Sequence, residues 1–349
     1  MAQSAEDGKA ARPKQVTLLN VARKAGVSRA TASLVVRKSP LISERTRIAV
    51  ESAMEELGYV YNAGAARLRA SHSRTVGVIV PNLTNPFFSI MLAGIEGVLE
   101  AAGYAVILAN SGEDAGKQRG FIRRMREHAV DGLIMCPAKD TPHEQISKIT
   151  EWSLPFVQAL RFVEDSRTDY SGIDYEGGMA AGARRLIALG HQRIGFVSVD
   201  AHYSAEAARL RGFHKALEES GLEPTFIVEC GLSARAARAL APSLVKSHRA
   251  SAIACFNDVI GLGLHRGLID LGIEIGRQVS LLGFDDVPEA ELVSPELASV
   301  STDPHSVGEA AARLLLRRIA HPESQIESII AKVKLVERPS IGPATVDGA

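Results

Sequence analysis

The sequence lacks the features of several large protein classes. It has no run of about 20 apolar residues that could span a membrane. Its first residues, MAQSAEDGKAARPK, contain no apolar stretch like that of a secretory signal, so we expect a cytoplasmic protein. Three widely spaced cysteines, Cys136, Cys230 and Cys255, fit neither a disulfide framework nor a CxxC zinc site. We expect them to be small buried apolar residues.

Recognisable catalytic and nucleotide-binding motifs are missing too. GLGLHRG at 261–267 has its third glycine one position too late for a dinucleotide fingerprint. In SGEDAGKQ, four residues rather than five separate Gly112 from Lys117, which is one short of a P-loop. The sequence contains no GxSxG and no HExxH, and its ten histidines are scattered. We therefore predict that the protein is not an enzyme and has neither a cofactor nor a metal site.

The formal net charge of zero conceals a strong asymmetry along the chain. Residues 12–74 hold twelve basic and four acidic side chains, a net charge of +8. Residues 75–349 carry −7. A basic module of this kind favours a polyanionic partner, because Lys and Arg neutralise phosphates and supply most non-specific affinity for DNA.

The basic module has the pattern of three short helices. Thr17 and Ser28 are predicted N-caps of helices at 18–25 and 29–37, and Gly26 permits the sharp turn between them. A third helix follows Ser43, ends at Gly58, and has a predicted buried stripe of Ile48, Ala53, Met54 and Leu57. Helix, glycine turn, helix is the helix-turn-helix pattern, whose second helix enters a DNA major groove. We assign 15–61 to an all-α DNA-binding domain that follows a flexible tail, 1–14.

After residue 74 the pattern changes to that of an α/β fold. The length, 349 residues, leaves room for two further cores. Apolar runs alternate with helical stretches twice, first in TVGVIV, AVILAN, DGLIMC and PFVQAL, then in RIGFVSV, TFIVEC, SAIACF and VSLLGF. The simplest packing is a two-lobed, doubly wound body over 74–341, with a flexible tail at 342–349. We expect lobe 1 to comprise about 74–173 and 302–331, and lobe 2 about 174–301 and 332–341.

The runs VTLLNVARKAGVSRATASLVV and ISERTRIAVESAMEELGYVYN closely resemble the DNA-binding headpiece of the LacI/GalR family, and the likeness continues through most of the chain. The resemblance implies a repressor that binds a pseudo-palindromic operator in double-stranded DNA as a homodimer. It places Arg29 and Ala30 at base-contacting positions. It places phosphate contacts at Thr17, Ser28, Thr31, Ser33 and Arg37. Leu34 departs from the family, because many members have a base-contacting arginine there, so a known half-site cannot be transferred.

The segment 62–73 resembles the hinge helix of the family. Asn62 is its predicted N-cap, and Leu68 is the only large apolar residue between Asn62 and Arg74. In a hinge helix Leu68 would be inserted between base pairs in the minor groove and would kink the duplex. The alternative is a flexible linker, and we expect that state off DNA.

The same resemblance extends to periplasmic sugar-binding proteins, whose ligand lies between two lobes. Ligands of open α/β sheets collect at the carboxyl ends of strands. Predicted effector-binding residues that follow such ends are Asn82, Phe87, Phe88, Asn257 and Asp285, and Arg209 is predicted at the head of a helix that faces the same space. For each of these a capping or lobe-bridging role is the alternative, and Asp286 is the more structural of the aspartate pair. The expected effector is a sugar or sugar derivative, and the alternative function is a solute-binding protein of a transport system.

Overall fold

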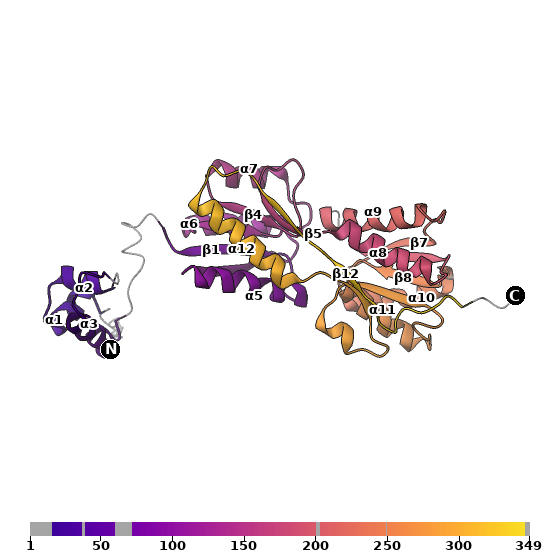
Figure 1. Ribbon diagram of the computed structural model, residues 1–349, viewed down its shortest axis with the longest axis horizontal. Coiled ribbons are helices and arrows are strands. Elements are labelled where there is room, and N and C mark those ends of the chain that lie inside the picture. The colour runs from indigo at the N-terminus through magenta and orange to yellow at the C-terminus, as the bar shows by residue number, and fades with distance from the viewer. Residues whose placement is uncertain (1–15, 37–38, 60–71, 200–202, 249, 346–349) are drawn as a thin grey trace, which may run out of the picture. The chain divides into compact units, whose positions relative to one another are not determined.

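The computed structural model describes residues 16–36, 39–59, 72–199, 203–248 and 250–345, and it divides the chain into two compact units, Met1–Ser71 and His72–Ala349 (Figure 1). Each unit has its own hydrophobic core. In the described part of the chain, no helix has the length and apolar character needed to cross a membrane.

The first unit contains three helices, α1 (Leu18–Lys24), α2 (Arg29–Val36) and α3 (Glu44–Leu57). Thr17 and Asn20 form a reciprocal capping box at α1, and the Ser28 hydroxyl accepts the Thr31 N–H at 3.0 Å. Gly58 ends α3 in the left-handed conformation, with φ 61°. The core is made by Val21, Ala22, Ala32, Val35, Val50 and Ala53.

One residue of the predicted α3 stripe was wrong. Ile48 is 58% exposed, and Val50 is buried in its place. Val50 lies three residues before Ala53 and therefore shares its face of the helix. Ile48 lies five residues before Ala53, which turns it about 140° away.

The first lobe of the second unit is a six-stranded parallel sheet in the order β11-β5-β4-β3-β1-β2. The strands are β1 (Thr75–Val80), β2 (Ala105–Asn110), β3 (Gly132–Met135), β4 (Phe156–Ala159), β5 (Asp169–Ile173) and β11 (Ser328–Ala331). Its helices are α5 (Pro86–Ala101), α6 (Ala115–Glu127), α7 (His143–Glu151) and α12 (Pro304–Ala320).

The second lobe repeats this plan in the order β12-β10-β9-β8-β6-β7, with only β12 antiparallel to its neighbour. The strands are β6 (Ile194–Val199), β7 (Phe226–Cys230), β8 (Ala252–Cys255), β9 (Ser280–Asp285), β10 (Ala298–Ser301) and β12 (Lys334–Val336). The helices are α8 (Tyr175–Ala188), α9 (Ser204–Glu218), α10 (Ala234–His248), α11 (Asp258–Asp270) and the short 3-10 helix η1 (Pro288–Glu291). The predicted fold class, a helical headpiece followed by a two-lobed α/β body, is confirmed.

The chain passes between the two sheets three times. It leaves the first sheet after Ile173, returns to the first lobe between Ser301 and Pro304, and crosses again between Ala331 and Lys334. Because parallel strands point the same way in each sheet, the segments that follow their carboxyl ends gather at one edge of each lobe.

Two of the apolar runs lie at the edges of the sheets. β2 and β7 each pair with one neighbour only among the described strands, and Ile107, Leu108 and Ile227 on them are exposed. An edge strand lacks a neighbour on one side, which leaves part of its surface open.

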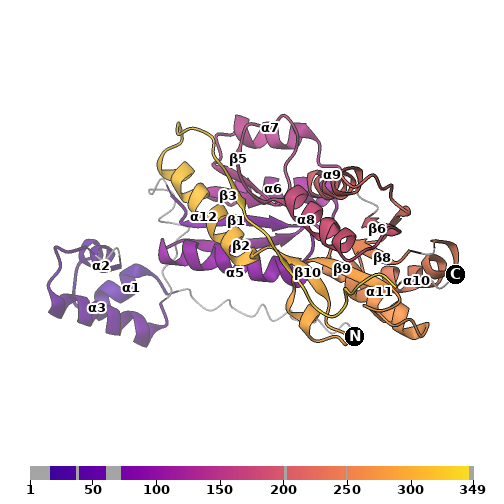
Figure 2. The same ribbon diagram turned by 45° about the vertical axis from the view of Figure 1, so that its right-hand side comes forward.

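Glycines allow the closest helix contacts in both lobes. The α5 and α12 helices lie side by side in Figures 1 and 2, and a Cβ atom at Gly308 would come within 2.1 Å of the Met91 carbonyl oxygen. A Cβ at Gly94 would meet the His305 carbonyl oxygen at 2.2 Å. In the second lobe, a Cβ at Gly212 would meet the Glu176 carbonyl oxygen at 2.2 Å. The backbones of these helix pairs are too close for any larger residue.

This packing predicts opposite effects for two glycine substitutions. We expect Gly308→Ala to lower the free energy of unfolding by about 1–3 kcal/mol, because α5 and α12 must move apart. Gly120→Ala is the control: its Cβ would meet only the Arg124 guanidinium, at 3.8 Å, and we expect it to raise stability by about 0.5–1 kcal/mol through helix propensity. Urea unfolding measures both. Equal or greater stability of Gly308→Ala would contradict the close contact.

Candidate functional site

The beginning of α2 presents the predicted base-contacting residues. Arg29 and Ala30 are exposed, and Thr31, Ser33 and Leu34 are partly exposed along the same helix. Ala32 and Val35 are buried on the opposite side, against α1 and α3. An exposed helix start that projects an arginine has the form needed to enter a major groove.

The predicted phosphate contacts include residues that also cap helices. The Thr17 hydroxyl donates to the Asn20 side-chain oxygen at 2.6 Å, and the Ser28 and Thr31 hydroxyls are 2.9 Å apart. These interactions stabilise the first turns of the helices, so helix capping is the alternative to phosphate binding for these residues. Arg37, Asn62 and Leu68 lie outside the described residues, as does most of the predicted hinge segment.

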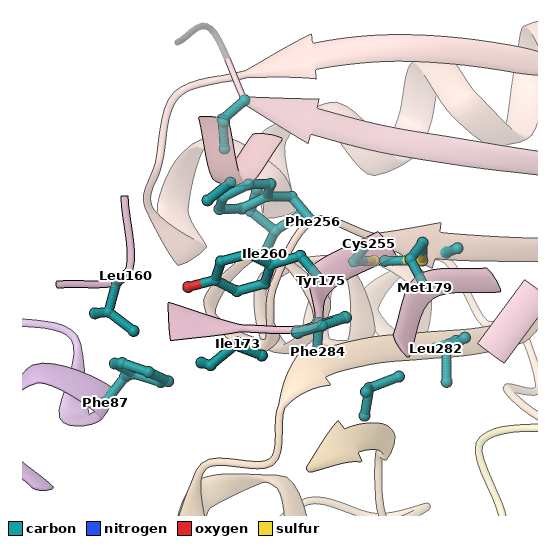
Figure 3. Close-up of a cluster of buried hydrophobic side chains, with 14 of the residues drawn as sticks. Phe87, Leu160, Ile173, Tyr175, Met179, Cys255, Phe256, Ile260, Leu282 and Phe284 are labelled. Carbon is teal, nitrogen blue, oxygen red and sulfur yellow. The ribbon is translucent and has the colours of Figure 1, made fainter. Parts of the chain in front are cut away.

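In the second unit, the strand ends bring Arg209 into an aromatic enclosure. Arg209 lies on α9 and is 3% exposed. Its guanidinium carbon is 4.1 Å from the ring centroid of Tyr175, 4.4 Å from that of Phe256 and 4.2 Å from that of Phe284. Figure 3 shows these three rings close together. Ring faces carry partial negative charge and stabilise a cation that has left water.

Arg209 has fewer polar partners than a buried guanidinium can use. It donates one hydrogen bond to the Ala205 carbonyl at 3.1 Å and one to the Asp285 carboxylate at 3.3 Å. Its Nε is buried and has no hydrogen-bond partner among the described residues. Buried polar atoms are nearly always paired, so this donor is available to a ligand.

Asp285 contacts this guanidinium, and Asp258 is a second buried carboxyl whose pKa Asp285 affects. Asp285 ends β9, and burial raises its pKa to about 7, although the Arg209 cation acts in the opposite direction. Asp258 accepts hydrogen bonds from the Ser299 hydroxyl at 2.7 Å and from the Val287 N–H at 2.9 Å. Burial, and then the charge of Asp285, raise the pKa of Asp258 well above its ordinary value. The site therefore places a hydrogen-bonding cation beside Asp285, a carboxyl that burial favours in the neutral form.

The other predicted effector residues make hydrogen bonds or packing contacts within the protein. Asn257 is buried, and its side-chain oxygen caps α11 by accepting the Ile260 N–H at 3.1 Å. The Asn82 side-chain oxygen accepts the Thr84 N–H at 2.9 Å. Phe87 and Phe88 are buried in the main core, in edge-to-face contact at 5.7 Å. Asp286 pairs with Arg338 at 2.7 Å, which is the structural role expected for it.

The sequence analysis missed a second group of buried polar residues. Arg161 follows β4 and makes a two-pronged ion pair with Glu113, at 2.9 and 3.0 Å. Its guanidinium carbon lies 3.6 Å from the ring centroid of Tyr203, which precedes α9. All three residues follow the carboxyl ends of strands, so the rule that selected Asp285 could have selected them too.

Within the described ranges, no three His, Cys, Asp or Glu residues are grouped so that they could hold a metal ion. The three cysteines are free and buried, and burial raises the pKa of the Cys136 thiol to about 12. A thiol in this state is a poor nucleophile.

Two family models match the chain and together cover most of it. Residues 17–62 match the bacterial regulatory proteins of the lacI family. Residues 73–339 match the periplasmic binding proteins and sugar binding domain of the LacI family. The boundary between the two matches falls where the helical unit gives way to the α/β unit.

Individual relatives agree with this assignment. The HTH-type transcriptional repressor PurR of Vibrio atlanticus is 33% identical over 337 residues, which is 93% of this chain and 98% of the relative. The transcriptional regulator CelR in complex with cellobiose is 29% identical, with a TM-score of 0.69, over 94% of this chain and all of that one. The Lac repressor dimer bound to operator and the anti-inducer ONPF is 25% identical, with a TM-score of 0.85, over 94% of this chain and all of that one.

These relatives are transcriptional regulators rather than enzymes. The matched residues include the capped helices of the first unit, the α9 helix that carries Arg209 and the end of β9 that carries Asp285. The chain belongs to the LacI family of DNA-binding transcriptional repressors, with a helix-turn-helix region and an effector-binding domain of the periplasmic-binding-protein type.

Proposed function

We propose that this protein is a cytoplasmic repressor that binds a pseudo-palindromic operator as a homodimer and responds to a small carbohydrate. The observation that carries the effector assignment is the buried pair of Arg209 and Asp285 among three aromatic rings. The exposed start of α2 supports the DNA assignment. A transport role is not favoured, because a solute-binding protein has no use for a helix-turn-helix region.

On DNA, α2 would enter the major groove, with Arg29 donating to a base edge. An arginine paired with guanine is a common specific contact, and Ala30 can contact a thymine methyl group. Thr17, Ser28, Thr31, Ser33 and Arg37 would bind phosphates and set the register. Leu34 contributes apolar contact where many relatives have an arginine. Asn62 and Leu68 would begin the hinge helix and kink the duplex.

The dimer would pair two headpieces with two half-sites. Ile107 and Leu108 on the edge strand β2 are exposed apolar side chains of the first lobe, and Leu292, after η1, is 80% exposed in the second. Exposed apolar side chains such as these favour contact with another protein surface. A second copy of the chain packed on these lobes would cover them.

The effector would be bound by hydrogen bonds from Arg209 and to Asp285. The free Nε donor and the nearby carboxyl oxygens suit adjacent hydroxyl groups of a sugar, and the rings suit its apolar faces. The cellobiose complex of the related CelR supports this ligand class. Binding that differs between two arrangements of the lobes would change operator affinity.

The DNA assignment predicts that Arg29→Ala removes sequence discrimination. An operator is first selected from random duplexes with the full-length protein, and affinities are then measured at one fixed salt concentration. We expect Arg29→Ala to weaken operator binding by about 1–3 kcal/mol and random-duplex binding far less. Arg23→Ala removes the same charge from α1 and should weaken both duplexes alike. Equal operator affinity of Arg29→Ala and wild type would exclude base contact by Arg29.

The effector assignment predicts that Arg209→Ala abolishes the response to sugar. The screen is thermal shift of the full-length protein with a panel of mono- and disaccharides that includes cellobiose. A sugar that stabilises the wild type is then titrated into the operator complex. We expect no response from Arg209→Ala, whereas Arg211→Ala, on an exposed turn of the same helix, should respond normally. Unchanged sugar affinity of Arg209→Ala would rule out this site.

A further inference from the structure

Tyr203 is the point at which the two lobes touch beside the proposed effector site. It precedes α9 in the second lobe, and its ring lies under the guanidinium of Arg161, which follows β4 in the first lobe, at 3.6 Å. The next residues of both segments are also in contact, because the Phe162 N–H donates to the Ser204 hydroxyl at 3.1 Å. Two adjacent contacts therefore join the lobes here.

Arg161 is held firmly on its own side. Its guanidinium binds both carboxylate oxygens of Glu113 and donates to the Pro137 carbonyl at 3.2 Å. Arg161 is only 6% exposed. A planar guanidinium fixed by a two-pronged ion pair keeps its face available to an aromatic ring. Because Arg161 is fixed in the first lobe, its contact with the Tyr203 ring depends on how the second lobe is positioned.

Tyr203 also faces the group around Arg209. Its ring centroid is 6.1 Å from that of Phe256, and the Phe256 ring in turn packs on the Arg209 guanidinium at 4.4 Å. Burial raises the pKa of Tyr203 to about 12, so the phenol stays protonated and can donate. The series of contacts runs from Glu113 through Arg161, Tyr203 and Phe256 to Arg209.

The Tyr203 hydroxyl is buried and has no hydrogen-bond partner in the described part of the chain. Arg209 Nε, at the end of the same series of contacts, is also buried and has no hydrogen-bond partner among the described residues. An unpaired buried polar atom is rare and lowers stability. The Tyr203 ring and the Arg209 guanidinium both pack against the Phe256 ring. Two unpaired donors on side chains that share this neighbour indicate a site where a polar ligand can accept hydrogen bonds from both.

We propose that Tyr203 is an effector-binding residue whose hydroxyl bonds the ligand and whose ring, held by Arg161, transmits occupancy of the site to the contact between the lobes. This inference rests on the proposed function and extends it to a residue of the second lobe and its partner in the first. A ligand that draws the phenol toward Arg209 alters the stacking on Arg161. Effector affinity and lobe arrangement are thereby linked through one side chain.

The hydroxyl is tested with the full-length protein and the sugar that the panel identifies. We expect Tyr203→Phe to weaken sugar binding about tenfold, the loss expected for one hydrogen bond to a ligand. Tyr104→Phe makes the same chemical change beside Arg74, away from this group, and should bind like the wild type. Wild-type affinity of Tyr203→Phe would overturn the proposal. If no sugar stabilises the wild type, the carbohydrate assignment fails, and the hydroxyl assignment fails with it.

The contact between lobes is tested without sugar or DNA. The native cysteines are buried, so spin labels can be placed selectively at Lys148→Cys in the first lobe and Lys215→Cys in the second. Excess unlabelled protein limits each dimer to one labelled subunit. We expect Arg161→Met to broaden the distribution of label distances and shift it to longer values. Arg184→Met, which breaks an exposed ion pair within the second lobe, should leave it unchanged.

Tyr203→Leu provides a second route if Arg161→Met does not fold. It removes the ring and leaves the Arg161–Glu113 ion pair intact, and the same shift in label distances is expected. An unchanged distribution in either folded variant would overturn the coupling. Because this measurement needs neither operator nor sugar, its failure is distinct from failure of the proposed function.

Discussion

The burial of Arg209 is the constraint on which the effector domain depends. Removing a guanidinium from water costs several kcal/mol unless charge and hydrogen bonds replace the solvent. Three rings surround it: Tyr175 of α8, Phe256 just after β8 and Phe284 of β9. Asp285 approaches it from the end of β9. The compensation is incomplete, since Nε has no partner among the described residues. An incompletely satisfied cation in a well-packed enclosure is suited to a polar ligand.

That enclosure requires accurate placement of four separate segments of chain. Each lobe achieves this with a parallel sheet and with helix pairs brought close by glycines such as Gly308 and Gly212. Helices this close cannot approach further without steric contact between their backbones. The two lobes are joined where the chain crosses between the sheets and by the contact of Arg161 with Tyr203.

The DNA-binding unit obeys a different constraint. Its core is small, and its three helices depend on side-chain caps at Thr17, Ser28 and Ser43. Residues 12–74 carry a net charge of +8, which favours a polyanionic partner. Residues 75–349 carry −7, so the favourable electrostatic term for a polyanion is confined to the first part of the chain.

Local pattern determined much of this protein in advance. Caps and the glycine turn predicted the three helices of the first unit, and alternating apolar runs predicted two α/β lobes, because both signals depend on neighbouring residues. The strand-end rule selected Asp285 and the head of a helix selected Arg209; the structure brings the two into contact, and their effector role stays a prediction. Only the tertiary structure decided that Asn257 caps a helix and that Phe87 and Phe88 are core residues. It also decided that β2 and β7 are edge strands and that Arg161 contacts Tyr203. Those outcomes depend on contacts between segments far apart in the chain, which no local pattern records.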